Sequence, residues 1–137
     1  MLAIDKNVNS FLRQTMVAVL GTTNDDGTPH LTPIWYAWED DGAHMITGLT
    51  SAKWRNLQAR PYASLCVDRR EAPYAAIILY GEIEKIDRPV YALIESLAFR
   101  YLGAKEGQEF TEAYKNHLSS MVAFKLTPNR LVQNLNP

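Results

Sequence analysis

The sequence predicts a mainly β (α+β) protein, an antiparallel barrel of about six strands with a few peripheral helices. Three observations predict this fold. Segments with strand-like, period-two patterns recur along the chain, turn sequences rich in Asn, Asp and Gly join the first of them, and no alternation of strands with helices indicates a doubly wound sheet. Its 137 residues are enough for one domain, expected over residues 1–137. A closed or split barrel is favoured because closure removes exposed strand edges.

The first third of the chain predicts a short helix and a three-stranded meander. Within residues 5–14, Val8, Phe11 and Leu12 recur at helical spacing. Strands are then expected over residues 16–23, 29–38 and 43–48. The residues between them, 24–27 and 40–42, tolerate positive φ and predict tight turns.

The middle of the chain predicts a capped helix followed by two strands. Thr50 or Ser51 is expected to cap a helix over residues 52–58, which Pro61 ends. The two strands are expected over residues 62–68 and 75–86. Gly81 lies inside the longer strand and indicates a bulge or a bend at a barrel corner.

A longer amphipathic helix and a final strand are expected in the last third. Asp87 is predicted to cap the helix and Gly103 to end it, and the polar segment up to His117 has room for another short helix. The last strand is expected over residues 121–126. Leu131 and Val132 extend it beyond a predicted turn at Pro128.

Charge and composition disfavour nucleic-acid and membrane partners. The chain carries 14 basic and 15 acidic side chains, a formal net charge of −1, so no one-signed field attracts a polyanion. No window approaches the roughly 20 apolar residues that span a bilayer. The N-terminus lacks the pattern of a signal peptide, and a cytoplasmic location is expected. The single cysteine, Cys66, cannot form an internal disulfide.

One segment combines the features of a phosphate cradle. A predicted strand ends at Thr47 and Gly48, hydroxyl residues follow, and a helix opens with Lys53 in its first turn. Free backbone N–H groups, hydroxyls and an ammonium together suit a phosphate. Capping residues and a surface lysine are an equally ordinary explanation of the same pattern, and both remain open at this point.

Histidines and aromatics give weaker indications. His30, His44 and His117 lack metal-ligand spacing, so no metal site is predicted. Strand alternation places the Trp35 and Tyr36 side chains on the two opposite faces of one strand. An aromatic ring on each face requires two buried surroundings, such as a barrel interior and a subunit interface. A homodimer is one interpretation, and a core face with a surface face is the other.

Several short segments occur in a specific order along nearly the whole chain. They are residues 17–22, 26–30, 32–35, 51–53 with 56–57, Pro61, 63–65, 80–83 and 100–103. This series resembles the pyridoxamine 5′-phosphate oxidase-like proteins. It is most similar to their small flavin- and deazaflavin-dependent oxidoreductases.

The resemblance implies a six-stranded split β-barrel homodimer that binds FMN or the deazaflavin coenzyme F-420, and it leaves that choice open. Two cofactor sites are implied at the dimer interface. The implied cofactor-binding residues are Leu31, Thr32, Pro33, Ile34, Trp35 and Tyr36 along the ring system, then Ile46 and Thr47, then Ser51, Ala52, Lys53 and Asn56 around the phosphate, with Ala76 and Tyr80 from the other subunit.

Three positions depart from the oxidase pattern. Ala52, Leu31 and Ala76 stand where true oxidases have an arginine, an arginine and a glutamine, and residues 131–135 offer no counterpart of their substrate-binding Arg and His. Vitamin B6 synthesis is therefore not expected.

The implied function is hydride transfer between the cofactor and a small organic substrate, with no catalytic side chain required. The alternative is a non-catalytic flavin or haem binding or carrier protein on the same barrel. An oligonucleotide-binding barrel is disfavoured by the neutral charge.

Overall fold

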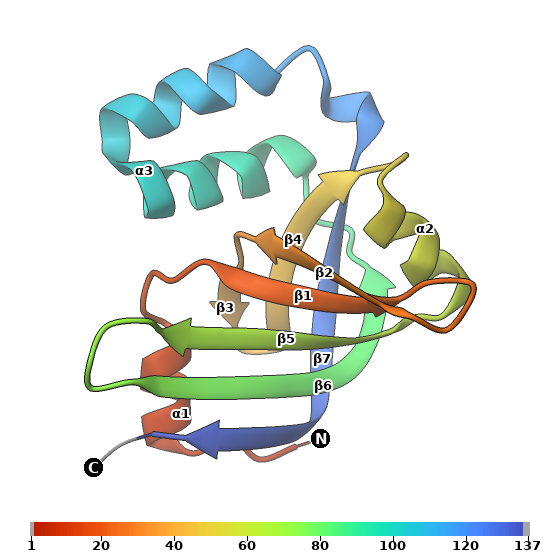
Figure 1. The fold of residues 1–137 in the computed structure, drawn as a ribbon. Coiled ribbons are helices and arrows are strands. Elements are labelled where there is room, and N and C mark those ends of the chain that lie inside the picture. Colours follow the sequence, from red (N-terminus) through yellow and green to blue (C-terminus); the bar gives the residue numbers. More distant parts are fainter. Residues whose placement is uncertain (1, 136–137) are drawn as a thin grey trace.

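The computed structural model describes residues 2–135, which form seven strands, three α-helices and one short 3-10 helix. In chain order they are α1 (Lys6–Leu12), β1 (Ala18–Thr23), β2 (Pro29–Ile34), β3 (Ala37–Glu39), β4 (Gly42–Gly48), α2 (Ala52–Ala59), β5 (Tyr62–Arg69), β6 (Ala75–Lys85), α3 (Val90–Tyr114), the 3-10 helix (Leu118–Ser120) and β7 (Met121–Asn134). All strands belong to one curled antiparallel sheet, in the order β2-β1-β5-β6-β7-β4-β3 (Figure 1). The expected mainly β, antiparallel fold is confirmed. Within residues 2–135, no helix is long and apolar enough to cross a membrane.

The strand expected over residues 29–38 is in fact two strands, so the sheet has seven strands and not six. β2 pairs with β1, whereas β3 pairs with β4 at the opposite end of the sheet order. Trp35 and Tyr36 form the corner between them. The backbone N–H of Tyr36 donates to the Tyr101 hydroxyl at 3.2 Å, which replaces a ladder hydrogen bond at the corner. Side chains continue to alternate between the two faces across this corner: Ile34, Tyr36 and Trp38 belong to one apolar cluster, and Trp35 and Ala37 to the other. The sequence pattern therefore did not reveal the break between the two strands.

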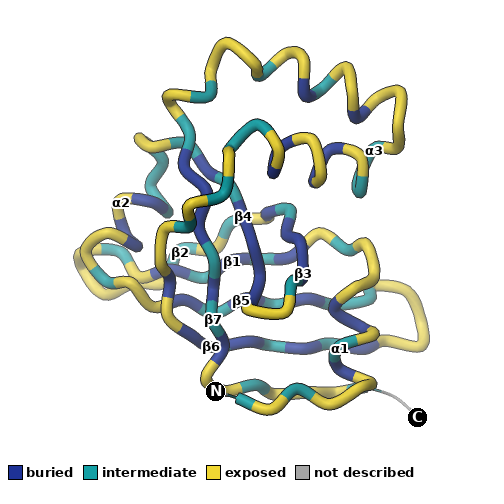
Figure 2. Tube along the Cα trace, turned by 180° about the vertical axis from the view of Figure 1, so that it is seen from behind, coloured by how far each residue is buried: buried dark blue, intermediate teal, exposed yellow. Residues whose placement is uncertain are grey.

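Alternation along the strands builds the main core inside the curl. Burial alternates residue by residue in β1, β5 and most of β6 (Figure 2). Helix α1 adds Val8, Phe11 and Leu12 to this core, as expected, and Asp5 caps it by accepting the N–H of Val8 at 2.9 Å. The largest fully buried side chains include Tyr36, Phe124, Leu12, Leu20 and Met45.

Helix α3 covers the other face of β4 and the start of β7. Leu93 and Leu97 pack there against Ala123, and Trp35 joins them at the edge. The helix begins at Val90 after Pro89, which has no capping side chain, so the expected cap at Asp87 is wrong. Proline suits a helix start because its fixed φ is already helical and no N–H is lost.

Gly103 breaks α3 into two antiparallel segments. Its backbone adopts φ 84° and ψ 177°, so the prediction that it ends the first helix is confirmed, and the polar stretch after it forms a second helical segment (Figure 1). The two segments pack closely at Gly107, where a Cβ would press into Phe99 and the Ala98 carbonyl. The hairpin therefore folds back over the sheet.

Strand β7 runs without interruption past Pro128, so the turn expected there is wrong. The predicted irregularity at Gly81 is confirmed: the register shifts there, with Tyr80 opposite Arg130 and Gly81 opposite Pro128. The bulge, not a turn, accommodates the proline, since a bulged position requires no ladder N–H.

Candidate functional site

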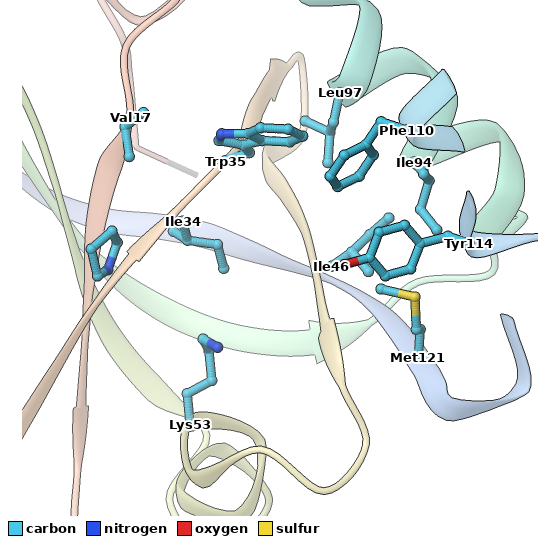
Figure 3. A pocket seen from close by; sticks show the side chains of 11 residues that line it. Val17, Ile34, Trp35, Ile46, Lys53, Ile94, Leu97, Phe110, Tyr114 and Met121 are labelled. Atoms are coloured by element: carbon cyan, nitrogen blue, oxygen red, sulfur yellow. The ribbon is translucent and has the colours of Figure 1, made fainter. Parts of the chain in front are cut away.

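A cavity of about 340 Å³ lies between the sheet and helix α3 (Figure 3). One wall comes from β2 and the corner after it, from β4 and α2, and from the residue before β1, and it consists of Val17, Pro33, Ile34, Trp35, Ile46 and Lys53. The other wall comes from α3 and the first residue of β7, and consists of Ile94, Leu97, Phe110, Tyr114 and Met121. Lys53 is the one charged side chain in this lining, so the cavity is apolar with a cation at one end.

Local structure at the start of α2 positions the cation. Ser51 is the N-cap, and its hydroxyl oxygen accepts the N–H of Trp54 at 3.2 Å. Lys53 Nζ donates to Thr47 Oγ1 at 3.0 Å, and this oxygen lies 3.1 Å from Ser51 Oγ. An ammonium, two hydroxyls and the positive end of a helix dipole are thus brought together.

The environment of Lys53 suits an anionic ligand. Among residues 2–135, no ion pair includes Lys53. Burial lowers the pKa of Lys53 below its ordinary value of 10.5, because the ammonium has lost part of its hydration without gaining a carboxylate. A phosphate would supply the missing counter-charge, so the residues present fit a phosphate-bearing cofactor.

The residues expected along the ring system of the cofactor lie in three different places: the cavity, the outer face of the sheet and the core. Pro33, Ile34 and Trp35 line the cavity, together with Ile46 from β4. Leu31 lies on the outer face of the sheet with an exposed side chain. Only half of the predicted β2 segment therefore faces the cavity.

Thr32 and Tyr36 lie on the core side of the sheet. Thr32 pairs opposite the buried Leu20, and its hydroxyl oxygen is buried without a hydrogen-bond partner among residues 2–135. The Tyr36 hydroxyl donates to the Leu12 carbonyl at 2.8 Å, and burial raises the pKa of Tyr36. The position of Tyr36 is that of a core residue.

Asn56, expected near the phosphate, is directed away from the cavity. It is buried, and its amide nitrogen donates to Thr22 Oγ1 at 3.1 Å and to Asn24 Oδ1 at 3.0 Å. These bonds attach α2 to the end of β1 and to the turn that follows it. Ala52 begins α2 and can offer only its backbone.

Ala76 and Tyr80 are absent from the lining of this cavity. Strand pairing places both on the outer face of the sheet, where the Tyr80 ring lies 4.2 Å from the guanidinium carbon of Arg130. A role at a cofactor site therefore requires a second copy of the chain.

Trp35 has its aromatic partners within the same chain. It stacks on Tyr101, with ring centroids 4.9 Å apart and planes 5° apart, and it contacts Phe110 at 5.1 Å. The Tyr101 hydroxyl donates to the Met16 carbonyl at 2.8 Å. Helix α3 thus provides the second buried surrounding of the aromatic strand, so Trp35 does not itself require a subunit interface.

The α3 wall was missed by the sequence reasoning. The helical pattern of Leu93, Ile94 and Leu97 predicted a buried face, but not that this face closes a cavity. Phe110 and Tyr114 belong to the segment that looked polar. They reach the cavity only because the chain reverses at Gly103.

The histidines lie outside the cavity lining. His44 is buried, with Nε2 2.7 Å from Asp41 Oδ1 and Nδ1 3.1 Å from an Arg88 nitrogen. The described part of the chain contains no group of three or more His, Cys, Asp or Glu residues arranged to hold a metal ion.

Comparisons with known proteins establish the family to which the chain belongs. Residues 4–134 match the family model described as pyridoxamine 5′-phosphate oxidase. The chain therefore belongs to the pyridoxamine 5′-phosphate oxidase-like family of split-barrel proteins. No curated protein matches its sequence significantly.

Solved structures with the same fold have several functions. A protein described as an F-420 reductase superposes with a TM-score of 0.77 at 23% identity, covering 94% of this chain and 98% of that one. The haem storage protein HutZ from Vibrio cholerae superposes with a TM-score of 0.69 at 14% identity, covering 96% of this chain and 94% of that one. An FAD-binding protein from Mesorhizobium loti superposes with a TM-score of 0.66 at 17% identity, covering 93% of this chain and 89% of that one. At these identities the likeness concerns the fold alone.

Proposed function

We propose that this protein binds a flavin or deazaflavin through its phosphate and uses it to transfer a hydride to or from a small organic substrate. The observation that carries the proposal is Lys53, a half-buried cation without a carboxylate partner, at one end of an apolar cavity. Family membership supports the proposal, since relatives with this fold are described as an F-420 reductase and an FAD-binding protein. FMN and F-420 both carry the phosphate, and either fits the proposal.

The residues of the chain bind and orient the cofactor in this proposal. When bound, the cofactor accepts or donates the hydride, which carries both electrons. Lys53, with Thr47 and Ser51, holds the phosphate. Trp35 and Ile46 pack against the ring system, and helix α3 excludes water from it. The one proton that completes a hydride reduction comes from solvent or from the substrate.

A homodimer is proposed from the outer face of the sheet. Strand register places Pro33, Val19, Cys66, Ile78 and Val132 in one row across five strands. Figure 1 shows this face from the front, with no helix of residues 2–135 over it. The face also carries Leu31, whose exposed fraction of 69% is high for a leucine. A partner copy would cover this apolar face and could bring its own Ala76 and Tyr80 to the cavity.

Ile78→Asp is expected to convert this dimer to a monomer. A carboxylate buried without a partner costs several kcal/mol, so the dissociation constant should rise by at least about 100-fold. Light scattering during size-exclusion chromatography measures the mass, and Gln58→Asp on the exposed side of α2 is the control. A wild-type protein that is monomeric at high micromolar concentration would contradict the proposed dimer.

Cofactor affinity is expected to fall as the pH rises towards 10.5, the ordinary pKa of lysine. The protonated form of Lys53 binds the phosphate, and burial lowers its pKa, so the loss begins below that value. Fluorescence titrations at several pH values from about 7 to about 10 measure it. Lys53→Arg should remove this pH dependence because the guanidinium does not titrate in that range. An equal decline in Lys53→Arg would assign the effect to another group.

Turnover separates the oxidoreductase from the non-catalytic carrier. The protein is loaded with chemically reduced cofactor without oxygen, then mixed with an organic electron acceptor, and cofactor reoxidation is followed by absorbance. Reoxidation faster than that of free cofactor supports an oxidoreductase. Slower reoxidation supports a carrier, and if neither FMN nor F-420 binds, haem is the next ligand to titrate.

A further inference from the structure

His44 joins strand β4 to the connection that leads from β6 into helix α3. It is buried, and strand alternation places it on the same face of β4 as Ile46, which lines the cavity. Its Nδ1 lies 3.1 Å from a guanidinium nitrogen of Arg88, two residues before α3 begins at Val90. This contact therefore holds the start of the helix that covers the cavity.

The two partners of His44 fix its protonation state. A guanidinium has only donors and keeps its proton in proteins, so the Arg88 N–H donates and Nδ1 of His44 accepts. The proton of the imidazole is therefore on Nε2, which donates to Asp41 Oδ1 at 2.7 Å. This arrangement requires the neutral imidazole, since Nδ1 has to remain without a proton.

A second proton on His44 is incompatible with the contact to Arg88. It would bind to Nδ1 and would bring two N–H donors and two cations within 3.1 Å of each other. The contact with Asp41 has the opposite preference, because a carboxylate stabilises the imidazolium. On protonation, His44 therefore keeps Asp41 and loses Arg88.

The other charged groups around this contact come from several elements of the sheet. Lys125 Nζ donates to Asp41 Oδ2 at 2.9 Å and lies 3.6 Å from Glu84 Oε1. An Arg88 nitrogen lies 3.0 Å from Glu39 Oε1, and α3 packs on this face of the sheet through apolar side chains. The cluster thus has three carboxylates and two cations, which are Glu39 of β3, Asp41 of the turn before β4, Glu84 of β6, Arg88, and Lys125 of β7. A proton on His44 would balance these charges.

Asp41 stays ionised over the range in which histidines titrate. Its hydrogen bond with Lys125, and less strongly that with His44, holds the pKa of Asp41 below its ordinary value of 3.8. A histidine ordinarily changes its charge between about pH 5 and about pH 8, and carboxylates, lysine and arginine ordinarily titrate outside this range. His44 is therefore the member of the cluster whose charge changes there.

We propose that the contact between His44 and Arg88 is a pH-sensitive switch: in mildly acidic solution His44 gains a proton, Arg88 is released, and the start of α3 loosens over the cavity. Arg88 then keeps its partly exposed ion pair with Glu39, and such pairs contribute little. The middle of α3 remains attached through Tyr101, whose hydroxyl donates to the Met16 carbonyl. The switch therefore loosens one end of the helix and leaves the rest of the fold in place.

Hydrogen exchange followed by NMR tests the switch at the start of α3. The Leu93 N–H donates to the Pro89 carbonyl at 3.1 Å and reports on the first turn of the helix. Its protection factor is compared at about pH 8 and about pH 5. This ratio of intrinsic to measured exchange rates removes the direct effect of pH on the exchange chemistry. The amide of Leu65, a fully buried residue of β5, is the reference.

Three variants assign the effect to individual residues. His44→Gln keeps a donor and an acceptor but cannot gain a proton in this range. Arg88→Ala removes the contact at every pH. His117→Gln is the matched control, because it removes a different histidine, which lies beside the Tyr114 ring near the other end of α3.

In wild type, the protection factor of Leu93 should fall by about 5- to 10-fold between about pH 8 and about pH 5, as the loss of one hydrogen bond does, and that of Leu65 should change less. His44→Gln should keep the high value of Leu93 at both pH values. Arg88→Ala should have the low value at both. His117→Gln should behave as wild type.

The inference is overturned if the Leu93 protection factor of wild type is the same at both pH values, or if its change persists in His44→Gln or Arg88→Ala. An equal change at Leu93 and Leu65 would also overturn it, since the whole fold would then be responding. If a variant does not fold, an NMR titration of the His44 imidazole in wild type decides. Protonation of His44 without a change at Leu93, or no protonation down to about pH 5, contradicts the switch.

Cofactor affinity gives a second readout, and this readout alone rests on the proposed function. At about pH 5, wild type should bind FMN or F-420 several-fold more weakly than His44→Gln, and at about pH 8 the two should bind equally. Comparing the two proteins at one pH cancels the protonation of the FMN phosphate, whose second pKa is about 6. If neither cofactor binds, the proposed function fails, whereas the exchange measurement still decides whether the switch exists.

Discussion

Lys53→Ala is expected to weaken the binding of FMN or F-420 by about 10- to 100-fold. The ammonium is the one charged group in the cavity lining and the natural partner of the phosphate. A hydrogen bond to a charged group contributes about 1.5–3 kcal/mol, and a partly desolvated site strengthens it. The change is measured by quenching of cofactor or tryptophan fluorescence.

The fold should tolerate this substitution. Burial of Lys53 penalises its charged form, and the side chain makes one hydrogen bond, to Thr47, so the free energy of unfolding should change by less than about 1 kcal/mol. Lys105→Ala removes an exposed lysine from α3 as the matched control. Equal affinities of wild type and Lys53→Ala for the cofactor would show that the phosphate lies elsewhere.

Tyr101→Phe is expected to lower the free energy of unfolding by about 2–4 kcal/mol. Its hydroxyl donates to the Met16 carbonyl at 2.8 Å and accepts the Tyr36 N–H at 3.2 Å. Phenylalanine keeps the stacking on Trp35 but leaves both backbone groups partly buried and unpaired, at about 1–3 kcal/mol each. The Tm should fall by roughly 6–15 °C.

The same substitution also tests how the corner of the sheet is held. Chemical denaturation measures the stability change, and Tyr91→Phe is the control because its hydroxyl contact with Glu112 is long, at 3.5 Å. Cofactor affinity should fall less than in Lys53→Ala, because Trp35 keeps its place against Phe110. Equal stability of wild type and Tyr101→Phe would mean that the corner between β2 and β3 holds without this hydroxyl.

Features encoded within a few residues were predictable from the sequence. The turns of the meander, the cap at Ser51 and the irregularity at Gly81 each follow from the conformational preference of one or two residues, and the structure has all three. The placement of Lys53 beside Thr47 and Ser51 is similar, because Thr47 near the end of the strand and Lys53 at the start of the helix are only six residues apart in the chain.

Features that depend on distant partners were not predictable. The corner at Trp35 and Tyr36 depends on Tyr101, which is 65 residues away from Tyr36 in the chain. Asn56 looked free to reach a phosphate, but Thr22 and Asn24 bind its amide. The α3 wall depends on a reversal at Gly103 that brings a polar-looking segment back to the cavity. Alternation and helical periodicity describe one element at a time and contain no information on these contacts.

The most direct measurement of the central claim compares FMN with riboflavin, which lacks the phosphate, on wild type and Lys53→Ala. If Lys53 holds the phosphate, wild type should bind FMN more tightly than riboflavin by about 10-fold or more, and Lys53→Ala should lose this preference while its riboflavin affinity changes little. If FMN does not bind but F-420 does, the same comparison is made with F-420 and its phosphate-free deazaflavin precursor. An equal loss of affinity for both members of the pair in Lys53→Ala, or no binding of either cofactor to wild type, would contradict the claim.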